Sequence, residues 1–422
     1  MLQSIALFLC LGAGVVFAQE PPTATTPSMS VYLDCQDFGA CDFDFFRTEL
    51  TMVNWVRDRQ VADVHILVTT QQTGSGGREF TVTFLGLRQF AGINDTLKYV
   101  SPPASSQDEQ RKGLAGIFRL GLVRYFARTP GGARLTIGFG DQKTESGQAS
   151  PQKDKWKAWV YRIGVNGSSS GEEQFKSFRF GGNVSANRVT EKWKTEIFGY
   201  ENYNQNEFDL DDTTTFVNIQ RNYSASLLQV KSLTQHWSAG LRGSVSSSTY
   251  SNYLHAVRVL PAVEYNVFPY SQSTRRQLLL EYDIGYAHFA YRDTTIYFKT
   301  KEGMPLQRLL MTVRTRETWG SIDVGSALTS YLHDRSKYRL STFGEFSLKL
   351  FKGFSLNGFA YYERIYDQFG LALKDFTPEE KLTRQFQLGT TYSYFANLGL
   401  SYTFGSIYNN VVNPRMGGGF FD

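Results

Sequence analysis

The stretch from Gln387 to Phe404, near the end of the chain, alternates between apolar and polar side chains. One face holds Leu388, Tyr392, Tyr394, Ala396, Leu398, Leu400, Tyr402 and Phe404 and is broken by Thr390. The other face is small or polar apart from Phe395. This period of two is that of a β-strand, but the run is longer than a globular core usually needs. A strand between hydrocarbon and water explains it, so the sequence predicts a transmembrane β-strand.

The composition favours strands over helices as membrane-spanning elements. Aromatic residues make up 15% of the chain, with 33 Phe and 24 Tyr beside 38 Gly, which suits barrel strands with aromatic girdles. After the N-terminal region no apolar run is long enough to cross a bilayer as a helix. The net charge of +5 comes from scattered Lys and Arg matched by nearby Asp and Glu, which argues against a nucleic-acid partner.

From Trp156 onward, polar loops separate twelve alternating segments. These run approximately over 156–167, 175–189, 193–206, 214–231, 237–249, 254–269, 276–291, 307–318, 321–332, 338–351, 354–366 and 386–404. The turns near Thr190, Thr234, Ser271, Thr318 and Lys352 are short, and several loops at the opposite end are longer. The predicted fold class is mainly β: a transmembrane antiparallel β-barrel of about 12 strands at 156–404, followed by a tail at 405–422.

The region before the barrel has a different pattern. Residues 1–18 contain an apolar run that ends in Val16-Phe17-Ala18, which indicates a secretory signal peptide. Residues 19–30 form a Pro/Thr-rich tether, residues 31–140 a small α+β domain, and residues 141–155 a polar linker. A chain with this order is expected to place the α+β domain in the periplasm.

Within the α+β domain the pattern predicts the order α-β-β-β-α. Asp42 is expected to cap a helix with Phe46, Leu50 and Val53 on one face. Strands at 64–68, 80–84 and 97–100 follow, and a second helix begins after Asp108. The turn from Gly74 to Gly77 joins two strands rather than opening a helix, so it is a hairpin turn and not a phosphate-binding loop.

Trp55 lies off the apolar face of the first predicted helix. Two interpretations are open for it: a patch that docks on the barrel mouth, or burial against the hairpin.

Two cysteines, Cys35 and Cys41, remain after the signal region. In an oxidising compartment they are expected to form a disulfide that closes a small loop. A metal site is the alternative, because Asp34, Asp37, Asp42 and Asp44 surround the pair. Without a His, and with hard oxygen beside soft sulfur, the group matches no common metal geometry. The sequence therefore predicts a disulfide, no metal and no cofactor.

Charged side chains on the polar faces of the barrel strands are predicted to face the lumen, since a Lys or Arg facing lipid near the midplane costs roughly 2–4 kcal/mol. They are Arg258, Glu264, Glu281, Asp283, Asp323, Arg339, Glu345 and Lys349. Mutual neutralisation of these charges is favoured over a selective channel.

Catalysis has little support in the sequence. The five histidines are His65, His236, His255, His288 and His333. His255 has hydroxyls nearby in the sequence, but no motif supplies a nucleophile, a base and an orienting group together. The chain is predicted not to be an enzyme, and a membrane-embedded hydrolase is the weakest alternative.

Three segments resemble an uncharacterised family of Gram-negative outer-membrane β-barrel proteins with an N-terminal periplasmic α+β domain. They are residues 264–276, 350–356 and 399–415, and the resemblance extends to Cys41-Asp-Phe-Asp44 and Asp63-Val-His-Ile-Leu-Val-Thr69. It implies the fold and the outer membrane, and it implies no reaction or ligand residues. It also suggests that Leu398, Leu400, Tyr402 and Phe404 form the terminal signal read by the barrel-insertion machinery.

The leading functional hypothesis is a pore or transport-related role in the outer membrane, with the periplasmic domain binding a partner or gating the lumen. The alternative is a plugged barrel that anchors or docks a periplasmic protein partner. Outer-membrane lipid and lipopolysaccharide are the other expected partners, because mild basicity suits anionic head groups.

Overall fold

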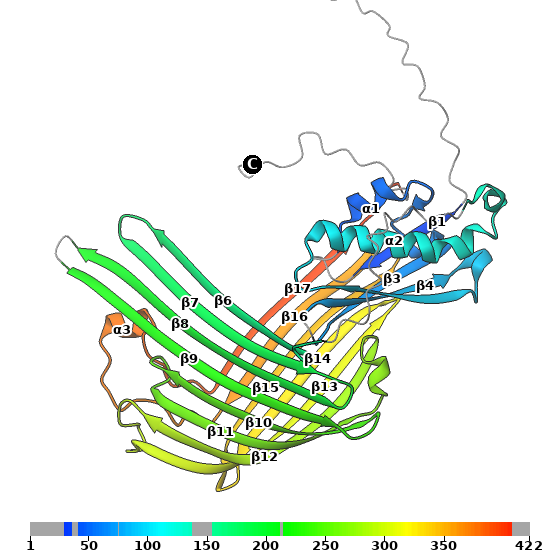
Figure 1. The fold of residues 1–422 in the computed structure, drawn as a ribbon. Coiled ribbons are helices and arrows are strands. Elements are labelled where there is room, and N and C mark those ends of the chain that lie inside the picture. Colours follow the sequence, from blue (N-terminus) through cyan, green and yellow to red (C-terminus); the bar gives the residue numbers. More distant parts are fainter. Residues whose placement is uncertain (1–28, 36–40, 75, 137–153, 212–213, 407–422) are drawn as a thin grey trace, which may run out of the picture.

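The computed structural model describes residues 29–35, 41–74, 76–136, 154–211 and 214–406. The predicted signal peptide, Asp37, and most of the tether, linker and tail lie outside these residues. The described residues form a five-stranded sheet in the N-terminal domain and a twelve-stranded antiparallel sheet after it (Figure 1). The predicted fold class, mainly β with a small α+β domain, is confirmed.

The N-terminal sheet has the order β2-β1-β3-β4-β5. Its strands are β1 (Ser30–Cys35), β2 (Asn54–Trp55), β3 (Val64–Gln72), β4 (Arg78–Gly86) and β5 (Asn94–Ser101). β1 pairs in parallel with β2 and β3, whereas β3, β4 and β5 are antiparallel. The predicted order α-β-β-β-α was wrong because it omitted β1 and β2. Both strands are short, and their parallel partners are distant in sequence, so no local turn signal marks them.

Two helices cover one face of this sheet (Figure 1). The first, α1 (Phe43–Glu49), starts as predicted, because the Asp42 carboxylate accepts a hydrogen bond from the Phe45 amide at 2.9 Å. It stops before Leu50, so Val53 reaches the core from a loop. The second, α2 (Gln107–Phe126), begins with a capping box between Ser106 and Glu109. Its buried face, with Leu114, Phe118, Leu122 and Tyr125, packs into the domain core.

The twelve-stranded sheet follows the chain order from β6 to β17. Its strands are β6 (Trp159–Gly171), β7 (Phe175–Val189), β8 (Trp193–Asp211), β9 (Thr214–Ser232), β10 (Trp237–Ser248), β11 (Tyr253–Asn266), β12 (Arg276–Tyr291), β13 (Lys301–Glu317), β14 (Gly320–Tyr331), β15 (Asp334–Phe351), β16 (Phe354–Ile365) and β17 (Tyr392–Tyr402). Short helices are η1 (Arg59–Val61), η2 (Arg88–Phe90), η3 (Pro130–Arg134), η4 (Tyr270–Gln272) and α3 (Pro378–Leu382). None of the helices in the described part of the chain has the length and apolarity to cross a membrane.

Sequence alternation located most of these strands. β7 and β12 have both ends where the pattern predicted them. The prediction was wrong for the terminal strand, which begins at Tyr392 rather than at Gln387. Gln387 belongs instead to the preceding loop, and its amide donates to the Tyr250 carbonyl at 2.8 Å. β13 and β15 also begin earlier than predicted, at Lys301 and Asp334, which shortens the loops before them.

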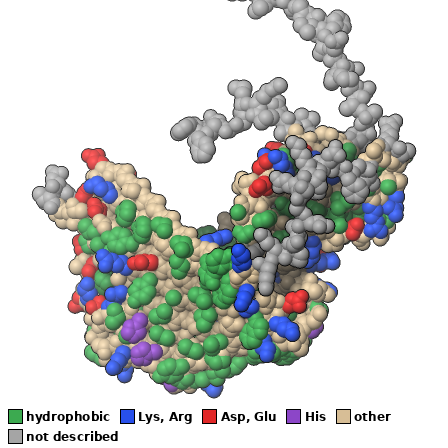
Figure 2. Space-filling view, in the orientation of Figure 1, with side chains coloured by type: hydrophobic (Ala, Val, Ile, Leu, Met, Phe, Trp, Pro, Cys, Tyr) green, Lys and Arg blue, Asp and Glu red, His purple; other side chains and the backbone are tan. Residues whose placement is uncertain are grey.

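The sheet curls strongly, and its two faces differ. On β12, Leu280, Tyr282, Ile284 and Tyr286 are between 40% and 52% exposed, whereas their neighbours Glu281, Asp283, Ala287 and Phe289 are buried. We call the face with the buried set the inner face and the other the outer face. Hydrophobic side chains are spread over the outer face in the view of Figure 2. This is the division expected of strands in a bilayer.

β6 and β17 are the two edges of the sheet, and among the described residues they are not hydrogen-bonded to each other. Unpaired strand edges are costly in hydrocarbon, so we expect these edges to meet in the membrane. Cysteines at Ile163 and Leu398, both exposed on the outer face, should then form an intramolecular disulfide in outer-membrane preparations. A covalent dimer on a non-reducing gel would mean instead that the edges pair between two copies.

Candidate functional site: the two ends of the barrel

The N-terminal domain lies against the end of the sheet that has the short turns. Lys349 on β15 forms an ion pair with Asp34 on β1, at 2.5 Å from Nζ to Oδ2. The Arg59 guanidinium donates to the carbonyl of Thr318, in the turn between β13 and β14. At the far side of the same end, Gly74 lies so close to the side chain of Val189 on β7 that a Cβ at position 74 would overlap it. The β3–β4 hairpin therefore extends across this end of the barrel.

Asp34 is the central group of the interdomain contact. It is 5% exposed, and the same carboxylate oxygen lies 3.3 Å from Nε2 of His65, itself fully buried. Burial acts to raise the pKa of Asp34, but His65 and the Lys349 ammonium together hold this pKa below its usual range. The alternation pattern predicted that Lys349 faces inward, but the sequence has no signal for its partner, which lies in another domain.

The join between domain and barrel contains cavities. One of about 670 Å³ lies between β3 and the strand ends around β12–β15, and it is lined by Thr69, Gln71, Gln277, Arg314 and Glu345 among others. A second cavity of about 360 Å³ lies beside Asp34 and is also bordered by Glu345. Residues of the domain and of the barrel line both cavities, so the interface is incompletely packed. The lining of the larger cavity is mostly polar, and that of the smaller one is mostly apolar.

The predicted inner-face charges in the middle of the sheet have oppositely charged partners. Glu281 and Asp283, at 3% and 0% exposure, share the guanidinium of Arg308 at 2.7 and 2.5 Å. Arg242 adds a bidentate contact to Glu281, with both nitrogen to oxygen distances 2.9 Å. The alternation pattern predicted the two carboxylates but not the two arginines, because pairing across strands depends on register.

The other predicted charges form separate groups. Asp323 pairs with Arg314 at 2.8 Å, and Arg339 pairs with Glu363 and Asp367 at 3.0 and 2.9 Å. The remaining residues have different contacts: Glu264 accepts from the Tyr270 hydroxyl, the Arg258 guanidinium lies over the Phe289 ring, and Glu345 borders the cavities. The eight residues thus do not form one cluster, and most of their partners are residues that the sequence did not single out.

An apolar cluster fills part of the inner face at the opposite end of the barrel. It consists of Ala256, Leu260, Ala287, Phe289, Tyr291, Met304, Leu306, Tyr331 and Phe369. Phe369 comes from the loop between β16 and β17, residues 366–391, and its ring lies 4.7 Å from that of Tyr331. The same loop is hydrogen-bonded to the β12–β13 loop, where the amide of Ile296 donates to the carbonyl of Leu371. This end is therefore crossed by a loop attached on several sides.

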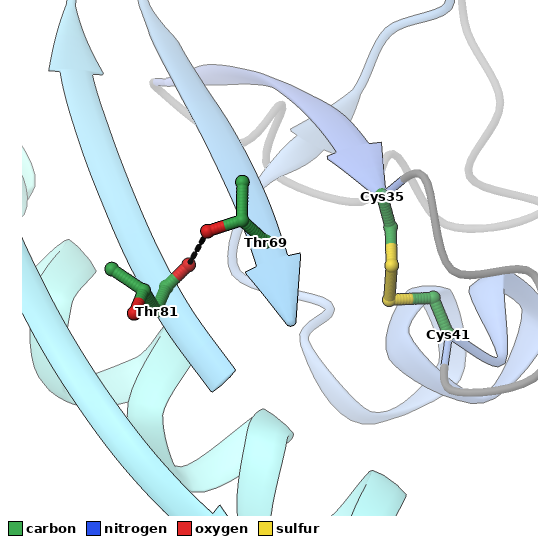
Figure 3. The surroundings of a disulfide bond; sticks show 4 residues. All are labelled: Cys35, Cys41, Thr69 and Thr81. Atoms are coloured by element: carbon green, nitrogen blue, oxygen red, sulfur yellow. Dashed lines mark hydrogen bonds between the residues drawn. A yellow bond between two sulfur atoms is a disulfide. The ribbon is translucent and has the colours of Figure 1, made fainter. Parts of the chain in front are cut away.

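The disulfide between Cys35 and Cys41 is present and joins the end of β1 to the segment before α1 (Figure 3). The metal alternative is not supported, because Asp42 caps α1 and pairs with Arg111, and Asp44 pairs with Arg47. Among the described residues, no group of three or more His, Cys, Asp and Glu side chains is placed to hold a metal ion.

Trp55 and the histidines are also placed by the structure. Trp55 is 4% exposed and belongs to the domain core, although it also borders the smaller cavity. The rings of His255 and His288 stack on each other with centroids 6.0 Å apart. His236 contacts the carbonyl of Asn266 next to a short turn.

Replacing Lys349 with Met should loosen the contact between domain and barrel. Asp34 would remain buried without its cation, a loss of roughly 1.5–3 kcal/mol for a charged hydrogen-bonded group. Hydrogen exchange in the turns at Thr318 and Lys352 should accelerate about tenfold or more. Lys352→Met is the matched control, because Lys352 is more exposed and lies 3.9 Å from Asp58.

The pH dependence of this contact follows from the lowered pKa of Asp34. A carboxylate with a depressed pKa stabilises the docked form above its ordinary pKa, and this contribution is lost as the pH falls through the lowered value. The protection of amides in the two turns, relative to their intrinsic exchange rate at each pH, should therefore fall only below about pH 4. A loss of protection already between pH 7 and pH 5 would contradict this assignment.

No family model and no curated protein matches the chain. A search of solved structures matches a NanC porin, in a rhombohedral crystal form, with 9% identity and a TM-score of 0.27. The match covers 57% of this chain and 99% of the porin chain. A likeness at this level supports no argument about function.

Proposed function

We propose that this protein is an outer-membrane barrel that passes a solute and that its N-terminal domain, in the periplasm, obstructs the pathway. The supporting observation is the position of the domain across one barrel end, from Lys349 on β15 to Val189 on β7. The larger cavity at this interface has a mostly polar lining, which suits a contact that opens, since interfaces between mobile domains are more polar than permanent ones.

The membrane partners belong to the same proposal. The apolar outer face contacts outer-membrane lipid and lipopolysaccharide. The exposed side chains of Leu398, Leu400, Tyr402 and Phe404 share one face at the end of the last strand, where the insertion machinery would read them. A periplasmic protein partner would act by displacing the domain.

The second candidate function is a plugged barrel that serves as an anchor. The paired charges around Arg308 and the apolar cluster around Phe369 favour it, because both fill the inner face.

Single-channel recording in planar bilayers distinguishes the two functions. The mature protein is compared with a version that starts at Lys153. Larger conductance in the shortened form supports a domain-gated pore, and silence from both folded forms supports the anchor.

A further inference from the structure

The inner face of β8 and β9 bears an uninterrupted ladder of side-chain amides. Three cross-strand pairs form it: Asn202 with Asn222, Asn204 with Gln220, and Asn206 with Asn218. Directly paired residues point to the same face, and every second residue along a strand does so, so all six amides lie together. The six residues of the ladder are uncharged, and Arg179 on β7 lies opposite Asn204 on the same face of the sheet.

The ladder has hydrogen-bonding groups that the described residues leave unused. The Oδ1 atoms of Asn204, Asn206 and Asn218 are buried and have no hydrogen-bond partner there. Asn218 is only 2% exposed. A buried amide oxygen without a partner costs about 1–3 kcal/mol, so such a group indicates that a further molecule or group binds here.

The loop of residues 366–391 already contacts the outer part of the ladder. The side-chain amide of Asn218 donates to the Thr383 carbonyl at 3.1 Å, and that of Gln220 donates to the Arg384 carbonyl at 3.0 Å. These are neutral oxygen acceptors, as sugar hydroxyls are. The loop thus uses the donors that a hydroxyl-rich ligand would use.

We propose that the amide ladder binds an uncharged, hydroxyl-rich solute of the oligosaccharide class, in competition with the loop carbonyls of Thr383 and Arg384. Amides supply donors and acceptors without charge, which matches paired hydroxyl groups. The other side of the inner face is occupied by ion pairs and by the apolar cluster. This inference rests on the proposed function, because it names the solute class that the barrel would pass.

Limited trypsin digestion of the full mature protein in proteoliposomes tests the competition. Lys381 and Arg384 lie in the loop, and cleavage there depends on how often the loop is detached. Maltohexaose should increase the cleavage rate several-fold, and trigalacturonate, which is similar in hydroxyl chemistry but acidic, should not. An equal effect of both sugars, or none from maltohexaose, would overturn the inference.

Variants separate binding from loop attachment. Asn204→Ala with Asn206→Ala should change cleavage without sugar little, since the hydrogen bonds described between ladder and loop come from Asn218 and Gln220. It should abolish the response to maltohexaose. Asn357→Ala on β16 is the control and should keep the response. A response that survives the double variant would exclude the ladder as the site. Single-channel conductance of the same preparations reports on the proposed function separately: conductance without a sugar response rejects only the ladder, and absent conductance rejects only the pore.

Discussion

Replacing Arg308 with Met is expected to lower the free energy of unfolding of the barrel by roughly 3–5 kcal/mol. Arg308 is the cation shared by Glu281 and Asp283, and both carboxylates are almost completely buried. Its removal would leave two like charges close together, with Arg242 touching only Glu281. The loss is measured by urea unfolding of the detergent-solubilised protein, followed by tryptophan fluorescence.

Arg275→Met provides the comparison for this experiment. Arg275 forms a similar pair with Glu317 at 2.7 Å, but its side chain is 63% exposed, so its loss should cost less than about 1 kcal/mol. If both variants lose the same small amount, water reaches Glu281 and Asp283 freely and the middle of the barrel is open. A large difference would show that the charge network is dry and contributes to the stability of the barrel.

The sequence predicted those features that depend on neighbouring residues and did not predict those that depend on contacts between residues distant in the chain. Alternation is a local signal, so it located strands such as β7 and β12 with both ends correct. It failed at Gln387, where the period of two continues into a loop that is fixed by contacts with distant segments such as Tyr250. A pattern identifies which side chains share a face, but it does not show where the neighbouring strand ends.

At the candidate site, too, the sequence predicted single residues but not their partners on other strands. Glu281 and Asp283 were identified because a charge on the lipid face is too costly, and that argument needs only one strand. Their partner Arg308 follows from the register between β12 and β13, which no local pattern reveals. The amide ladder did have a local signal, since Asn202, Asn204 and Asn206 recur at every second position. The sequence pattern alone does not show that Asn222, Gln220 and Asn218 on β9 lie opposite these three residues and complete the ladder.

Replacing Phe369 with Ala is expected to detach the loop of residues 366–391 from the barrel interior. Phe369 is 5% exposed and packs between the rings of Phe289 and Tyr331. Truncating a buried Phe costs roughly 3–5 kcal/mol, and each 1.4 kcal/mol changes a population tenfold. The fraction of time that the loop is detached should therefore rise about 100-fold or more, up to the limit set by its remaining hydrogen bonds.

Trypsin cleavage at Lys381 and Arg384 in intact proteoliposomes measures this fraction, because proteolysis follows the population of the open form when opening and closing are fast. Phe376→Ala is the matched control: Phe376 lies in the same loop but stacks on Phe386 within it, so its loss should change cleavage far less. Equal cleavage of the two variants would mean that Phe369 does not hold the loop. Faster cleavage of only the Phe369 variant would identify the aromatic contact as the attachment, and the same variant should then show longer open times if the barrel conducts.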